Sequence, residues 1–129
     1  MTQTANTLAM NTLRLDENCF IRSLLHDGKN YLSSRDICAA LDYSNISQAL
    51  TKSCSPEYIV ELQNIAKYPM DIQQISMAEV NGETALQHSY RMREKWLQEP
   101  AVYELSKAIN KPGTKQFQKW LYEEVQKFW

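Results

Sequence analysis

Four polar side chains, Ser47, Gln48, Thr51 and Lys52, recur at a spacing that places them on one face of a short helix. Glutamine carries the paired donor and acceptor that recognise adenine, and lysine can contact guanine or a phosphate. The chemistry that this face offers is therefore contact with base edges and with the nucleic-acid backbone. Two short amphipathic helices that only cover a sheet would show the same pattern.

A second group of residues that could contact phosphates is basic. Residues 91–119 carry seven basic and three acidic side chains, whereas residues 53–84 carry one lysine and five acids. The net charge of the whole chain, −1, argues against a general nucleic-acid coat but allows a local basic patch. A charge run of this kind can equally be a solvated surface. The candidate DNA-contact residues are, in chain order, Arg35, Ser47, Gln48, Lys52, Arg91, Arg93, Lys95, Lys111, Lys115 and Lys119.

Residues suited to catalysis or metal binding are sparse. His26 and His88 have no metal-ligand spacing to any cysteine. The three cysteines, Cys19, Cys38 and Cys54, form no Cys-x-x-Cys pair, and reduced thiols are the expectation. With three glycines in all, the chain has no glycine-rich phosphate loop. We therefore expect no catalytic residues, no metal site and no cofactor.

The elements that must position these side chains are clearest at the C-terminal end. Pro100 suits the first turn of one helix, Pro112-Gly113 suits the break after it, and Thr114 suits the N-cap of the next. Both helices carry an apolar stripe, which a chain of 129 residues is long enough to bury. The stripes are Val102, Leu105 and Ile109 on the first helix, and Phe117, Trp120, Leu121, Val125 and Phe128 on the second.

Glu124 falls inside the second stripe, where a buried carboxylate would lose its hydration. In one interpretation it lies at the edge of the stripe and reaches water. In the other it forms an ion pair with an arginine of the N-terminal half, for which Arg22 and Arg35 are the candidates.

The N-terminal half predicts a hairpin. Residues 1–18 show no clear hydrophobic period, and we expect them to form a mobile arm. Residues 19–25 and 29–32 are typical of two strands, and Asp27-Gly28 between them predicts a tight turn.

Two short helices are expected to follow the hairpin. Ser33 with Asp36 is a capping-box signature, residues 42–45 interrupt the helical pattern, and Asn45 suits the N-cap of a second helix. This pattern of lengths is typical of a helix-turn-helix, with Gln48 on its second helix.

The middle of the chain is the most ambiguous part. Asn81-Gly82 is a signal for a two-residue hairpin turn. Thr84 with Gln87 could cap a helix over the segment that follows. Alternatively, apolar and basic residues alternate there as in a strand, which is the interpretation we adopt. The alternating residues are Tyr90, Met92 and Trp96 on one face, and Arg91, Arg93 and Lys95 on the other.

Two stretches of the sequence resemble the BRO N-terminal domain, which is found in baculovirus repeated-ORF proteins and bacteriophage antirepressors. The first runs through Phe20-x-Arg22, Asp27-Gly28, Asp36-Ile37-Cys38, Leu41-Asp42-Tyr43 and Asn45. The second runs through Val102-Tyr103-Glu104-Leu105, Lys111-Pro112, Phe117-Gln118-Lys119-Trp120-Leu121 and Glu124-Val125. Asp42 stands where the family has glycine, and aspartate tolerates a left-handed backbone better than most residues.

The fold that we expect is α+β: a small antiparallel sheet with an N-terminal hairpin, covered by two short helices and the C-terminal helix pair. After the arm of residues 1–18, residues 19–129 are expected to form one BRO-like domain. A strand within residues 84–97 agrees with the order of elements in the family.

The resemblance implies a DNA-binding, antirepressor-like regulator encoded by a phage or prophage, with no catalytic activity. The alternative is a small phage inhibitor that binds a host protein, such as a repressor or a defence nuclease in the manner of an anti-CRISPR, without touching DNA. The expected partner is therefore DNA, held weakly by a local basic patch, or a host protein, and a homo-oligomer is left open. The chain lacks a signal-peptide pattern and a run of about 18 apolar residues, so we expect no membrane contact and a cytoplasmic location.

Overall fold

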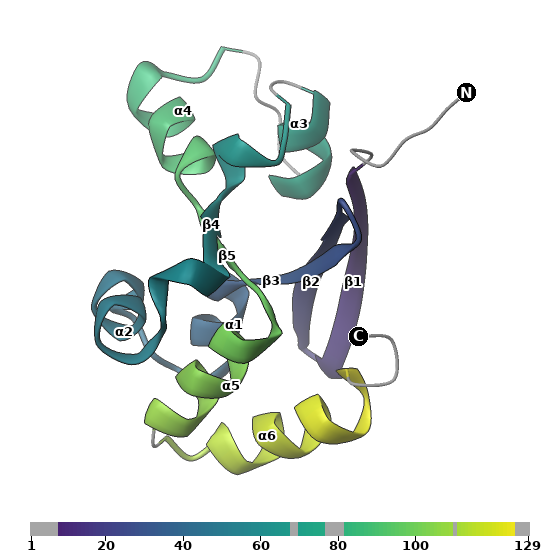
Figure 1. Ribbon diagram of the computed structural model, residues 1–129, viewed down its shortest axis with the longest axis vertical. Coiled ribbons are helices and arrows are strands. Elements are labelled where there is room, and N and C mark those ends of the chain that lie inside the picture. The colour runs from purple at the N-terminus through teal and green to yellow at the C-terminus, as the bar shows by residue number, and fades with distance from the viewer. Residues whose placement is uncertain (1–7, 68–69, 77–81, 110, 126–129) are drawn as a thin grey trace.

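A five-stranded antiparallel sheet lies at the centre of the computed structural model (Figure 1), which describes residues 8–67, 70–76, 82–109 and 111–125. The strand order is β1-β2-β3-β5-β4. The strands are β1 (Leu8–Asp16), β2 (Cys19–His26), β3 (Lys29–Ser33), β4 (Ile59–Glu61) and β5 (Lys95–Leu97). The last two come from parts of the chain far apart in sequence, so the sheet joins the N-terminal half to the C-terminal half.

The predicted hairpin is confirmed as β2 and β3. Asp27 and Gly28 both have positive φ, 52° and 76°, which is the backbone that a two-residue turn needs to match the twist of its strands. His26 pairs with Lys29 across this turn, and Ser23 pairs with Leu32 further along the ladder.

The expectation of a mobile arm is wrong for Leu8–Asp16, which form the edge strand β1 against β2. Leu8 and Met10 point to one side of the sheet, whereas Leu13 and Leu15 point to the other. Because the apolar residues change face halfway along the strand, no single period reveals it in the sequence. The first seven positions of the expected arm lie outside the described residues.

Four helices cover one face of the sheet, as predicted: α1 (Ser34–Ala40), α2 (Ile46–Ser53), α5 (Glu99–Ala108) and α6 (Thr114–Glu123). Their caps follow the sequence signals. The Ser33 hydroxyl accepts a hydrogen bond from the Asp36 amide, and the Asn45 side chain accepts one from the Gln48 amide. Asp42 has φ of 56°, so it takes the left-handed conformation at the family's glycine position. The α+β fold class is confirmed.

A second apolar cluster packs against the other face of the sheet, beneath α3 (Met70–Ser76) and α4 (Ala85–Met92). These two helices lie together at the end of the molecule opposite α6 (Figure 1). The buried residues of this cluster are Leu24, Tyr31, Leu62, Ile72, Ile75 and Trp96. Turns of 3-10 helix at Pro56–Tyr58 and Leu62–Asn64 flank β4.

The strand predicted between residues 84 and 97 is correct only for Lys95–Leu97. The preceding part is helix α4, and both hydrogen bonds of the Thr84–Gln87 capping box are present. Arg91, Arg93 and Lys95 therefore do not share a strand face. Asn81 lies outside the described residues, and the chain after Gly82 enters α4 rather than the strand of a hairpin.

Trp120 links α6 to β1, so replacing it measures how much the C-terminal part of the core contributes to stability. Its side chain is 8% exposed and its Nε1–H donates a hydrogen bond of 2.9 Å to the Arg14 carbonyl. Trp120→Ala should lower the free energy of unfolding by about 3–5 kcal/mol, as expected for a large buried side chain. In urea unfolding, Lys119→Ala on the exposed face of the same helix should change it by less than about 0.5 kcal/mol. Equal unfolding midpoints for the two variants would show that Trp120 is not part of the core.

Candidate functional site

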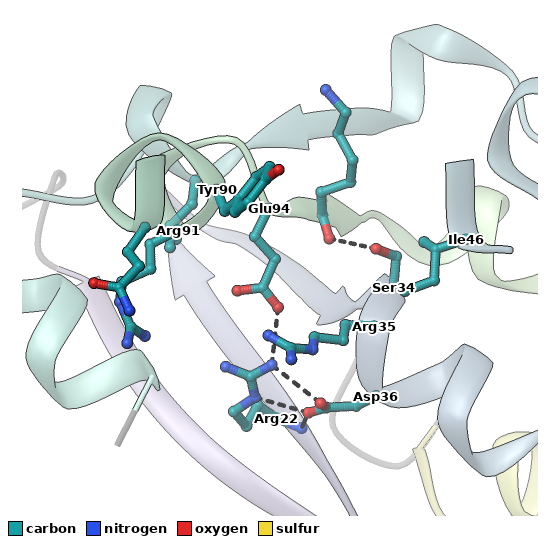
Figure 2. Close-up of a pocket in the computed structure, with 11 residues that line it drawn as sticks. Arg22, Ser34, Arg35, Asp36, Ile46, Tyr90, Arg91 and Glu94 are labelled. Carbon is teal, nitrogen blue, oxygen red and sulfur yellow. Dashed lines mark hydrogen bonds and ion pairs between the residues drawn. The ribbon is translucent and has the colours of Figure 1, made fainter. Parts of the chain in front are cut away.

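A network of two ion pairs lies between β2, α1 and the segment that leads into β5 (Figure 2). The Arg22 guanidinium donates through Nε to Asp36 Oδ2 at 2.8 Å and through Nη2 to Glu94 Oε2 at 2.8 Å. The Ser33 hydroxyl, which caps α1, lies 3.1 Å from both Arg22 Nη2 and Glu94 Oε2. One guanidinium thus links three segments that are far apart in sequence.

The remaining surroundings of Arg22 complete its hydrogen bonding. Nη1 donates to the Ile75 carbonyl at 3.0 Å, and the guanidinium carbon lies 5.3 Å from the centre of the Trp96 ring. Burial lowers the pKa of Arg22, but the hydrogen bonds and charges of Asp36 and Glu94 outweigh it, so the pKa is raised above its ordinary value. Arg22 is therefore paired with Asp36 and Glu94 and not with Glu124. Its hydrogen bonds join β2 to α1, to α3 and to the segment before β5.

A pocket of about 590 Å³ opens beside this network, between α1, the first residue of α2, α4 and β5. Arg35, Arg91 and Lys95 of the predicted set line it together with Tyr90. In Figure 2, Arg35 extends from α1 toward the middle of the pocket, where Arg22 and Glu94 also point.

The basic side chains that line this pocket differ in whether a carboxylate is already paired with them. Arg91 Nε lies 2.7 Å from Glu83 Oε2. Lys95 Nζ pairs with Glu61, and this hydrogen bond is the main reason that the pKa of Glu61 is lowered. Arg35 is exposed and has no carboxylate partner in the described part of the chain.

The outer face of α2 carries Ser47, Gln48 and Lys52, all exposed, as predicted. The buried face of this helix, Ala49 and Leu50, belongs to the same core cluster as α5. Directly after α2, the Ser55 amide and hydroxyl donate to Glu104 on α5 at 2.9 and 2.8 Å, which lowers the pKa of Glu104. The orientation of α2 is therefore fixed by the packing of its buried face and by the hydrogen bonds directly after its C-terminus.

Lysines gather on the surface of α5 and α6, around a hollow of about 500 Å³. Lys111 and Lys115 of the predicted set line it, and Lys119 is exposed one turn further along α6. The sequence interpretation missed Lys107, which lines the same hollow four residues before Lys111. Beside it the rings of Tyr103 and Tyr122 stack with centroids 5.5 Å apart.

The structure thus divides the ten predicted residues into separate groups. Arg35, Arg91 and Lys95 line the pocket, the three α2 residues share one face, and the other three lysines lie on α5–α6 or the turn between them. Arg93 is exposed at the end of α4, where its charge helps to lower the pKa of Glu61.

The cysteines are unsuited to nucleophilic chemistry. Cys38 and Cys54 are buried, and burial raises the pKa of each thiol to about 11, so that both are protonated at neutral pH. Among the described residues, no group of three or more histidine, cysteine or acidic side chains is arranged to hold a metal ion. No described helix has the length and hydropathy needed to cross a membrane.

A comparison with protein families matches residues 20–127 to the BRO family, N-terminal domain (Bro-N). The chain belongs to the BRO family. Comparisons with curated proteins and with solved structures gave no match. Two of the motif residues that carry the Bro-N resemblance, Arg22 and Asp36, are the two halves of one ion pair at the centre of the network. β1 precedes the matched region and adds an edge strand to it.

Removing the shared guanidinium should destabilise this Bro-N domain. The side chains of Arg22, Asp36 and Glu94 are 14%, 18% and 12% exposed, so Arg22→Met leaves two carboxylates close together with little water. We expect a loss of about 3 kcal/mol, at the low end of the range for breaking a buried ion pair. Urea unfolding of the wild-type and variant proteins measures this loss in the free energy of unfolding.

The matched control is Arg35→Met, which makes the same substitution at an exposed arginine with no carboxylate partner among the described residues and should change stability by less than about 0.5 kcal/mol. Adding Glu94→Gln to Arg22→Met should recover part of the loss, because one uncompensated charge is removed. Equal losses in the two arginine variants would contradict a structural role for the network.

Proposed function

We propose that this Bro-N domain binds double-stranded DNA, with α2 contacting the bases and the lysines of α5–α6 contacting the phosphates. The observation that carries the proposal is the exposed polar face of α2, whose opposite face is fixed against α5. Membership of the BRO family supports it, because BRO N-terminal domains are generally regarded as DNA-binding. In this proposal the protein is an antirepressor-like regulator of a phage or prophage and needs no cofactor or catalytic step.

The arrangement of α1 and α2 suits base contact. In a helix-turn-helix, the N-terminal residues of the second helix enter the major groove. Ser47 and Gln48 occupy the first turn of α2, and both are exposed. The side-chain nitrogen of Asn45 donates a hydrogen bond of 3.2 Å to Gln48 Oε1.

The phosphate contacts would come from side chains whose charge is not yet neutralised. Within the described residues, Lys107, Lys111, Lys115 and Lys119 form no ion pair with a carboxylate. Such contacts position a protein on the duplex without reading its sequence. By contrast, Arg91 and Lys95 would first have to leave Glu83 and Glu61.

A second candidate function is inhibition of a host protein, such as a repressor or a defence nuclease, without DNA contact. Leu86 and Tyr90, one turn apart on α4, are 61% and 68% exposed, and such exposed apolar side chains are typical of protein-binding surfaces. The DNA-binding experiment separates this candidate from the first.

DNA affinity should depend moderately on salt. If three or four lysines each neutralise one phosphate, the logarithm of the affinity should fall against the logarithm of the salt concentration with a slope of about −3 to −4. Lys115→Glu with Lys119→Glu should flatten this slope by about 2 units, because each removed contact contributes about one. Fluorescence anisotropy with a labelled duplex measures both. The matched control, Lys29→Glu with Lys67→Glu, makes the same charge change at exposed lysines away from α5–α6 and should keep the slope.

Gln48→Ala should act differently in the same assay, lowering the preference for a selected site over random duplex while leaving the salt slope unchanged. No salt-dependent DNA binding at low ionic strength would overturn the proposal. The α4 surface would then become the leading candidate, with a protein partner.

A further inference from the structure

The pocket between α1, α4 and β5 contains three kinds of group that the duplex-binding surface does not use. Arg35 supplies a cation, Tyr90 an aromatic ring, and Glu94 a carboxylate. Its volume of about 590 Å³ is within the range of about 300–1,000 Å³ that is typical of small-molecule sites.

Arg35 is the group best placed to take an anion. Arg22 is already paired with two carboxylates, Asp36 and Glu94, whereas Arg35 has no carboxylate partner among the described residues. It points toward the middle of the pocket (Figure 2). A guanidinium is planar and presents paired donors, so it can hold two oxygens of one phosphate at once.

Tyr90 offers a surface for a flat ring. It is 68% exposed although it lines the pocket, so the side chain can be covered further by a ligand. Stacking of a nucleobase on an aromatic side chain is worth about 1–3 kcal/mol. A carboxylate-bearing peptide would satisfy Arg35 but would leave this ring uncovered.

Glu94 supplies an acceptor. Its Oε2 atom accepts hydrogen bonds from Arg22 and Ser33, at 2.8 and 3.1 Å. Its Oε1 atom accepts none from the residues that the structure describes. A carboxylate oxygen of this kind can accept from an exocyclic amino group, as acidic side chains do from cytosine.

We propose that this pocket binds a nucleotide, with the phosphate on Arg35, the base stacked on Tyr90 and an amino group of the base donating to Glu94. The nucleotide can be free or part of a single strand, since both present the same groups. The proposal does not rest on duplex binding, because these residues belong to α1, α4 and the segment before β5 rather than to α2 or α5–α6.

The test is calorimetric titration of the full chain with dCMP, dTMP and inorganic phosphate. dCMP should bind saturably and more tightly than dTMP, which lacks the amino group, and than phosphate, which lacks a base. Arg35→Ala and Tyr90→Leu should each weaken dCMP binding at least about fivefold, the smallest effect expected from one lost stacking contact. Tyr90→Phe should keep the affinity, and Lys29→Ala, at an exposed lysine outside the pocket and outside the duplex-binding surface, should not change it.

Several results would overturn the proposal. One is the absence of saturable dCMP binding at millimolar concentration, and another is equal affinity for phosphate or for a glutamate-rich peptide. Unchanged binding in both Arg35→Ala and Tyr90→Leu is a third. A short single-stranded oligonucleotide distinguishes a free nucleotide from a nucleotide within a strand. Binding much tighter than that of dCMP, and still dependent on Arg35 and Tyr90, indicates a strand as the ligand. Affinity equal to that of dCMP indicates a free nucleotide. Loss of duplex binding with dCMP binding intact would overturn only the duplex proposal.

Discussion

The double ion pair of Arg22 holds together three parts of the chain that are far apart in sequence. Its carboxylates lie 14 and 72 positions further along the chain, so one guanidinium ties β2 to the start of α1 and to the segment before β5. Ser33, the N-cap of α1, hydrogen-bonds to the same groups. Burying three charges is unfavourable unless each is paired and hydrogen-bonded, and here both conditions are met. Arg35 is next to Asp36 on α1 and Tyr90 lies four residues before Glu94, so both flank this network and line the same pocket.

The charge distribution has a physical explanation in the fold. The acidic middle segment contributes Glu61 and Glu83, which neutralise Lys95 and Arg91 of the basic segment. Among the described residues, the lysines of α5, α6 and their connecting turn have no carboxylate partner, so their charge is available to an anionic ligand although the net charge of the chain is −1. The sequence shows the two opposite segments but not which of their members meet.

The local elements could be predicted from the sequence because their signals are local. Asp27-Gly28, the caps at Ser33 and Asn45, and the apolar stripe that contains Trp120 each act within a few residues.

The partners of Arg22 could not be predicted, since a carboxylate 72 positions away leaves no spacing signal. β1 was missed because its apolar residues serve both faces of the sheet. For α4 the capping signal was present, but the alternation around Tyr90 favoured a strand. For the candidate site, the helical spacing of Gln48 predicts its exposure, whereas the pocket around Arg35 depends on tertiary packing.

If DNA lies against α2 and α5–α6, it should shield the lysines of these elements from chemical modification. The decisive measurement is lysine acetylation in the presence and absence of duplex, read out by mass spectrometry. The internal reference is Lys29, the first residue of β3, and Lys67, which precedes α3. Both are exposed, and neither lies on α2, α5 or α6. We expect DNA to slow the acetylation of five lysines and to leave the two reference lysines unchanged. The five are Lys52, Lys107, Lys111, Lys115 and Lys119. Equal protection of all lysines, or protection of Lys29 and Lys67 alone, would contradict it.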